Sequence, residues 1–208
     1  MRQRIIKFIM IKNIIYFAFG LTCLTISFSY ASSTQKINNT EDITLIRLTT
    51  NKGNITIKLF NDEAPETVKN FLNYADNGNY DGTIFHRVIS NFMIQGGGLL
   101  PDMSQINSNV PVVNESNNNI SNKKGTLAMA RTSDPHSATS QFFINLKDND
   151  FLDKKNAPDN YGYCVFGEVV DGIDIVDEIG MTNTGNKAGH QDVPLEAIII
   201  EKVETIQN

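Results

Sequence analysis

The sequence predicts a mainly β domain, folded as an antiparallel barrel or as a sandwich. Short apolar runs recur along the chain, and turn-forming residues such as Gly, Pro, Asn and Asp separate them. Helical spacing, by contrast, appears in only two segments. The eight expected strands cover residues 45–50, 54–59, 83–88, 92–95, 126–130, 141–145, 163–169 and 197–203.

The first two runs are expected to form a hairpin. They flank residues 51–53, which end in Gly53, and glycine adopts the positive φ that tight hairpin turns need. A second connection is much longer. Residues 97–124 are rich in Asn and Ser and poor in apolar side chains, so we expect a long surface loop there.

Two segments have the spacing of amphipathic helices. Residues 63–75 begin with Pro65 in the first turn. Their apolar side chains fall at i, i+3, i+4 and i+7, namely Val68, Phe71, Leu72 and Ala75. Residues 173–179 lie between Gly172 and Gly180. Each segment has one apolar face, so each is expected to lie as a cap against the strands.

The first 31 residues are typical of an export signal. Basic residues precede the apolar run 14–28, and small residues stand at the cleavage positions just before Ser32. One alternative is an uncleaved membrane anchor, but the run is shorter than the ~20 residues that span a bilayer. A second alternative, a lipid-modified Cys23, lacks the expected surrounding pattern. A start at Met10 would keep the same apolar run.

Three parts are therefore expected: a signal peptide at 1–31, a flexible leader at 32–42 and one domain at 43–208. The mature protein would be exported, periplasmic and free of stable membrane insertion. Removing residues 1–31 takes away four of 18 basic residues and none of 23 acidic ones, which leaves a net charge of −9. So acidic a chain is a poor nucleic-acid binder, because phosphate contacts need clustered Lys and Arg.

Cys164 is the only cysteine of the expected mature chain, so an intrachain disulfide is excluded. It lies in the apolar segment 163–166 and is interpreted as a small buried hydrophobe. A reactive thiol, as in a cysteine hydrolase, is the alternative, and it requires an activating base and access.

Three segments carry the chemical signal, residues 85–97, 125–131 and 140–145. They read FHRVISNFMIQGG, GTLAMAR and SQFFIN, and they combine Arg87 with a set of apolar side chains. Together they resemble the cyclophilin family of peptidyl-prolyl cis/trans isomerases. The resemblance covers nearly all of residues 43–206, and it implies a closed eight-stranded antiparallel β-barrel with a helix over each open end.

The resemblance implies a non-covalent reaction centred on Arg87. Rotation about a peptide bond crosses a barrier of ~18–20 kcal/mol, and X-Pro bonds interchange slowly. A guanidinium N–H can donate a hydrogen bond to the proline nitrogen only when the lone pair of that nitrogen is no longer delocalised into the carbonyl. The contact therefore strengthens towards the twisted state. The alternative is that Arg87 forms an ordinary surface ion pair.

The resemblance also implies the substrate-binding residues. The proline ring should lie in a pocket of Phe92, Met93, Phe143, Leu152 and Tyr163. Backbone groups of the substrate should meet Gln95, Gln141, Ala130 and Arg131. Phe151 is counted with this set, although it stands where eukaryotic members have a tryptophan. Because Phe151 has no indole N–H donor, we expect weak or no cyclosporin binding.

The expected substrates are proline-containing segments of unfolded or partly folded exported proteins. We expect no cofactor and no metal, since His136 and His190 have no partner at metal-ligand spacing. If Arg87 faces the groove, strand alternation should turn His86 away from it. The chain is expected to be a monomer. The alternative function is a chaperone module that binds proline peptides without turning them over.

Overall fold

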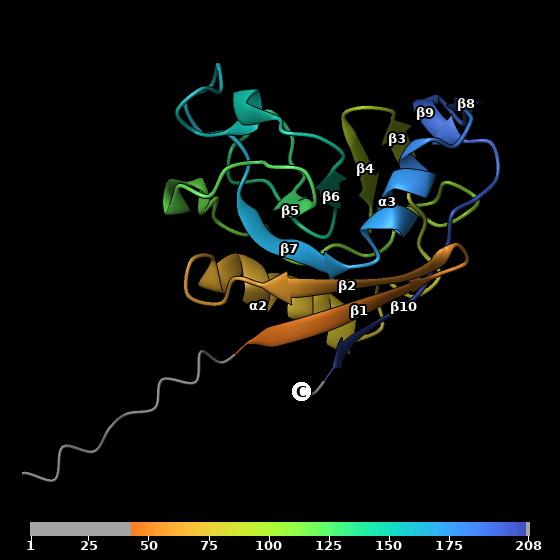
Figure 1. The fold of residues 1–208 in the computed structure, drawn as a ribbon, viewed down its shortest axis with the longest axis horizontal. Helices are drawn as coiled ribbons and strands as arrows, with labels where there is room; N and C mark the ends of the chain where they lie inside the picture. Colours follow the sequence, from red (N-terminus) through yellow and green to blue (C-terminus); the bar gives the residue numbers. More distant parts are fainter. Residues whose placement is uncertain (1–42, 207–208) are drawn as a thin grey trace, which may run out of the picture. The chain divides into compact units, whose positions relative to one another are not determined.

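The computed structural model describes residues 43–206, which all belong to one compact unit. The predicted signal peptide and leader lie outside the described residues. Eight strands form one antiparallel sheet in the order β10-β1-β2-β7-β5-β6-β4-β3 (Figure 1). Their bounds are β1 Thr44–Thr50, β2 Gly53–Leu59, β3 Arg87–Ile89, β4 Met93–Gly96, β5 Thr126–Met129, β6 Phe142–Asn145, β7 Val165–Asp171 and β10 Ile200–Ile206. The predicted mainly β antiparallel fold is confirmed.

The sheet curls into a half-barrel, so the predicted full closure overstates what the strands do. The two end strands, β3 and β10, share no ladder. One isolated bridge pairs Ile84 with Ile199, and hydrogen bonds run from Phe85 N to Ile198 O at 2.9 Å and from Ile200 N to Thr83 O at 2.8 Å. On one side these contacts come from residues 83–85, which precede β3, and on the other side from residues 198–200, where β10 begins.

Both predicted helices are present. Helix α2 covers Pro65–Asp76 and begins with proline at its first turn, and α3 covers Ile173–Gly180. The buried face of α2 includes Phe71, whose ring centroid lies 5.0 Å from that of Tyr80 and 5.4 Å from that of Phe166. Phe71 is fully buried, so α2 supplies the centre of the main core.

A further hairpin was not predicted. Strands β8 (Thr184–Lys187) and β9 (His190–Pro194) form a separate two-stranded sheet, drawn in dark blue beside β3 in Figure 1. Its two-residue turn, Ala188 and Gly189, has φ angles of 49° and 83°. Positive φ at both positions is the geometry of a type I′ hairpin turn. The hairpin is mostly exposed and polar, so the apolar alternation that marks strands is missing from it.

The long loop at 97–124 is also present and contains a short 3-10 helix at Ser116–Asn118. Another 3-10 helix, at Asp150–Leu152, lies between β6 and β7. None of the helices in the described range is both long and apolar enough to cross a membrane.

Candidate active site

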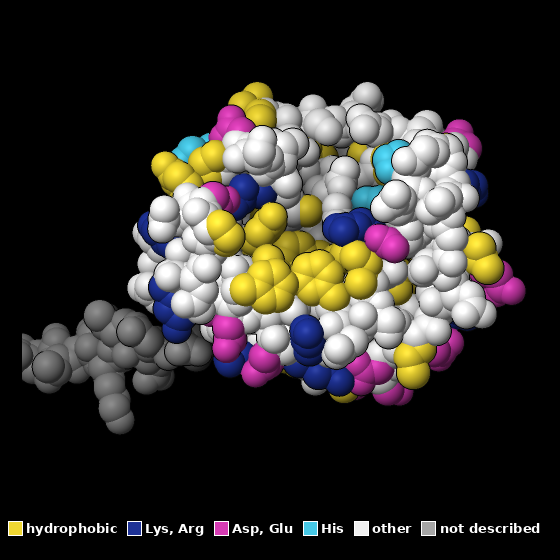
Figure 2. Space-filling model, turned by 90° about the horizontal axis from the view of Figure 1, so that it is seen from above, with side chains coloured by type: hydrophobic (Ala, Val, Ile, Leu, Met, Phe, Trp, Pro, Cys, Tyr) yellow, Lys and Arg dark blue, Asp and Glu magenta, His cyan; other side chains and the backbone are white. Residues whose placement is uncertain are grey.

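A cavity of about 520 Å³ opens where β3, β4, β5 and β6 meet the β8–β9 hairpin. Ten of the eleven residues predicted for the site line it, namely Arg87, Phe92, Met93, Gln95, Ala130, Arg131, Gln141, Phe143, Leu152 and Tyr163. Phe151 is the exception. Figure 2 shows this face of the molecule, with apolar side chains gathered beside basic and histidine side chains in a hollow.

Cross-strand pairing sets several of these residues in one row. Arg87 on β3 faces Gln95 on β4, Gln95 faces Phe143 on β6, and Phe143 faces Ala128 on β5. Directly opposed residues of antiparallel strands point to the same side of the sheet. The row therefore runs from a charged side chain through an amide to an aromatic ring on one face.

The apolar end of the cavity is a compact pocket. Met93, Phe143 and Leu152 are buried, and they form one cluster with the half-buried Phe92 and Tyr163. The rings of Phe143 and Tyr163 meet edge to face, with centroids 5.7 Å apart. Aromatic walls around a small hollow suit a flat aliphatic ring such as that of proline.

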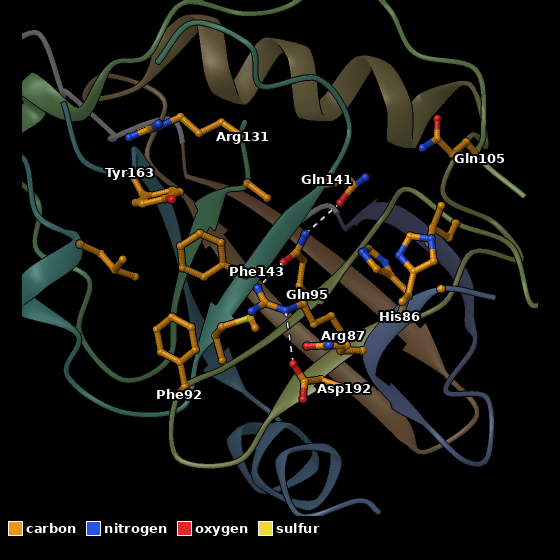
Figure 3. A pocket seen from close by; sticks show the side chains of 17 residues that line it. His86, Arg87, Phe92, Gln95, Gln105, Arg131, Gln141, Phe143, Tyr163 and Asp192 are labelled. Atoms are coloured by element: carbon orange, nitrogen blue, oxygen red, sulfur yellow. Dashed lines mark hydrogen bonds and ion pairs between the residues drawn. The ribbon is translucent and has the colours of Figure 1, made fainter. Parts of the chain in front are cut away.

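Polar side chains form a chain beside this pocket (Figure 3). Arg87 Nη1 donates to Gln95 Oε1 at 3.5 Å, and Gln95 Nε2 donates to Gln141 Oε1 at 2.8 Å. Gly98 makes room for Gln141, because a Cβ on Gly98 would lie 2.4 Å from Gln141 Cγ. The Arg87 side chain is 43 % exposed, so its guanidinium remains accessible to a ligand in the cavity.

Arg131 has a bracing role in the structure. Its guanidinium lies 4.5 Å above the Tyr163 ring, donates from Nε to Gly162 O at 3.1 Å and pairs with Asp159. Amide donors of Gly162 and Tyr161, together with Arg131, lower the pKa of Asp159 to about 2. The side chain of Arg131 thus holds the Tyr163 wall, and Arg131 lines the cavity beside Ala130.

Phe151 does not line the cavity. It is 53 % exposed, and its ring stacks on that of Phe92 with centroids 5.8 Å apart. Phe151 therefore supports one wall of the pocket from outside. Weak cyclosporin binding stays a prediction.

A buried network of asparagines, which the sequence did not signal, supports the same wall. Asn149 Nδ2 donates to Phe92 O at 2.9 Å and to Asn145 Oδ1 at 2.7 Å. Asn145 in turn donates to Asn122 Oδ1, and the main chain of Leu152 bonds Asn149 O. Buried polar groups keep their positions when they are hydrogen-bonded in this way. The network ties Phe92 and Leu152, from distant segments, to each other.

His86 lines the cavity together with Arg87, and the expectation that it faces away was wrong. The alternation rule does not reach His86, because the β3 ladder begins at Arg87. The ring is 5 % exposed, and its Nδ1 has no hydrogen-bond partner within the described part of the chain. Burial, with smaller effects of His190 and Arg87, lowers its pKa to about 4. His86 is therefore neutral at pH 7.

Leu99, Gln105 and the segment 189–192 also line the cavity and were not predicted. They belong to the long loop and to the unpredicted hairpin. Within residues 43–206, no group of three or more His, Cys, Asp or Glu side chains could hold a metal ion.

Cys164 lies outside the cavity. It is 3 % exposed, and burial is the main reason that its pKa is raised to about 11. Its sulfur lies 3.6 Å from Thr67 Oγ1. A buried thiol with a raised pKa has the properties of a core residue rather than of a nucleophile.

Comparison with known proteins decides the family. Residues 45–205 match the model of the cyclophilin type peptidyl-prolyl cis-trans isomerase/CLD family. The chain belongs to the cyclophilin family. It is 58 % identical over 160 residues to peptidyl-prolyl cis-trans isomerase B of Escherichia coli, with 76 % of this chain and 98 % of the relative covered. It is 53 % identical over 162 residues to isomerase cyp18 of Streptomyces antibioticus, covering 77 % and 98 %.

Solved structures agree with this assignment. The cyclophilin resembles a cyclophilin type isomerase of Cryptosporidium parvum with a TM-score of 0.66 and 27 % identity, covering 80 % of this chain and 99 % of the other. A second structure of that protein, in the presence of the dipeptide Ala-Pro, gives a TM-score of 0.65 and 28 % identity, covering 79 % and 99 %. The predicted activity, isomerisation of peptidyl-prolyl bonds, is confirmed at the level of the family.

Proposed function

We propose that Arg87 is the catalytic residue of this isomerase, and that the adjoining apolar pocket holds the substrate proline. The observation that carries the proposal is the position of one accessible guanidinium beside that pocket, in the same cavity. When the proline ring lies among Phe92, Phe143 and Tyr163, its nitrogen is directed towards the polar side chains of Arg87, Gln95 and Gln141. The pocket by itself explains binding, and Arg87 adds the chemistry.

The guanidinium acts on the twisted state of the X-Pro bond. In the planar ground state the nitrogen lone pair is delocalised into the carbonyl and is a poor acceptor. In the twisted state the lone pair is localised, so an Arg87 N–H can donate to it. A contact that is stronger in the transition state than in the ground state raises the rate. Gln95 and Gln141 offer further amide groups to the peptide backbone next to the bond.

The proposed substrates are proline-containing segments of unfolded or partly folded proteins in an export compartment. The Arg87 side chain in the cavity is 43 % exposed, so a peptide segment can reach it from solvent, and this supports extended substrates. The residues at the start of the chain, which are typical of a signal peptide, support export to a periplasm. The related structure in the presence of Ala-Pro supports the choice of an Ala-Pro peptide as a test substrate.

NMR exchange spectroscopy on a short Ala-Pro peptide tests the role of Arg87. The unchanged protein should give cis/trans exchange cross-peaks at catalytic amounts, and Arg87→Ala should remove them while the fold is retained. Arg47→Ala is the matched control, because Arg47 lies on β1 and does not line the cavity. Peptide shift changes without exchange in the unchanged protein would instead favour the non-catalytic binding module.

Fractionation of cells tests export separately. A chain with residues 1–31 should reach the periplasm and shorten there, whereas a chain without them should stay in the cytoplasm. Equal distribution of the two chains would contradict the proposed location and leave the role of Arg87 untouched.

A further inference from the structure

The β8–β9 hairpin brings a charged group to the active site that the sequence did not signal. Residues 189–192, from its turn and from β9, line the cavity next to β3. Asp192 is the only acidic residue among all those that line it. Its Oδ2 lies 3.8 Å from Arg87 Nε.

We propose that Asp192 is a positioning residue for Arg87. The inference rests on the catalytic role proposed for Arg87 above. Two groups hold the guanidinium at different nitrogens: Asp192 on the Nε side and Gln95 at Nη1 (Figure 3). Since the guanidinium is planar, contacts at two separate nitrogens restrict its orientation as well as its location. The rest of the fork stays free to donate to a substrate.

Orientation matters here because the arginine is otherwise mobile. Its side chain is 43 % exposed, and a long exposed side chain samples many rotamers. A catalytic N–H must point at the proline nitrogen when the bond twists, and a misplacement of about 1 Å is enough to weaken the contact. A carboxylate on the hairpin restricts the guanidinium to one side of the groove before substrate binds.

The backbone at Asp192 supports this interpretation. Asp192 has φ of 59°, a left-handed conformation inside strand β9. Non-glycine residues adopt it uncommonly, Asn and Asp most readily, and such outliers often occur at functional sites. The left-handed residue interrupts the regular extended strand at the point where the hairpin meets Arg87. Asparagine also tolerates this backbone conformation and has nearly the same shape as aspartate. Asp192→Asn therefore removes the charge without changing the backbone or the packing.

The size of the effect follows from the exposure of the pair. The Asp192 side chain is 40 % exposed, and exposed ion pairs are weak. Loss of such a contact in the transition state lowers kcat by about two- to fivefold. KM should change little, because the apolar pocket that binds the ring is untouched. Arg87→Ala, which removes the catalytic group itself, should lower activity far more.

The test compares three variants of the full chain: Asp192→Asn, Arg87→Ala and Glu201→Gln. Glu201 is exposed on β10, does not line the cavity and loses the same charge in its substitution. Isomerisation of an uncharged Ala-Pro peptide gives kcat and KM by NMR. A ¹⁵N spectrum of the arginine Nε–Hε groups, with the Arg87 signal assigned by its loss in Arg87→Ala, reports directly on that group.

Asp192→Asn should lower kcat two- to fivefold, leave KM nearly constant and shift the Arg87 Nε–Hε signal, with no such changes in Glu201→Gln. An unchanged kcat, or an unmoved Arg87 signal, in folded Asp192→Asn would overturn the role of Asp192. Full activity in Arg87→Ala would contradict the catalytic role of Arg87, and the positioning role of Asp192 would then fail as well. An equal fall in kcat in Glu201→Gln would assign the effect to net charge, which also overturns the role of Asp192.

Discussion

Substitution of His86 should change how the stability of this cyclophilin depends on pH. His86 is 5 % exposed, and burial, with help from His190 and Arg87, lowers its pKa from 6.5 to about 4. The unfolded chain binds a proton at His86 as the pH falls through 6.5, whereas the folded chain does so only near pH 4. Between these values the unfolded state holds more protons, so acidification favours unfolding.

The magnitude follows from the two pKa values. Above pH 6.5 His86 is neutral in both states and imposes no pH-dependent cost. Between pH 7.5 and pH 5.0 the lowered pKa removes roughly 2 kcal/mol of unfolding free energy, and below pH 4 roughly 3 kcal/mol. His86→Gln has no such proton to bind. Between pH 7.5 and pH 5.0, the unfolding free energy of His86→Gln should therefore fall by roughly 2 kcal/mol less than that of the unchanged protein.

Urea unfolding followed by far-UV circular dichroism at pH 7.5 and pH 5.0 measures this difference. Other groups titrate over the same range, so the quantity of interest is the difference between the unchanged protein and His86→Gln at each pH. Equal losses of stability in the unchanged protein and in His86→Gln would refute the reasoning.

Three further predictions concern the core and the walls of the pocket. Phe71→Ala should lower the free energy of unfolding by about 3–5 kcal/mol, seen as a lower urea midpoint, because a fully buried ring leaves a cavity. Asn149→Leu should raise KM for an Ala-Pro peptide more than it lowers kcat, because Phe92 O loses its donor and the pocket wall loosens; an unchanged KM would contradict this. Cys164 should react with a thiol reagent only after denaturant is added, since it is buried with a raised pKa; rapid labelling of the native protein would contradict this.

The sequence allowed most strands and both helices to be predicted, for reasons that are local. In α2 the apolar period and the early Pro65 act within one turn of the chain, and the observed helix begins at that proline. The first hairpin follows from Gly53, which has φ of 141°. Strand ends were less accurate: the run predicted at 197–203 is the strand Ile200–Ile206. The ends of a strand are set by its hydrogen bonds to neighbouring strands, and those strands can lie far away in the sequence.

The β8–β9 hairpin could not be predicted from apolar alternation, because most of its side chains face solvent. Its turn also lacks the Asn-Gly or Asp-Gly pair that is typical of type I′ turns, since Ala188 occupies the first position. Gly189 was the one available signal. With the hairpin, Asp192 and His190 were missed as residues of the site.

By itself, the sequence was enough to show the resemblance to the cyclophilin family, because Arg87 and several of the apolar residues near it lie in three short segments that resemble those of the family. Only the tertiary structure decided which groups surround Arg87. His86 enters the cavity because the strand ladder starts one residue after it, and Asp192 arrives from more than a hundred residues along the chain. Contacts between distant segments depend on where the chain turns back on itself. The periodicity of side chains within one helix or strand does not predict this.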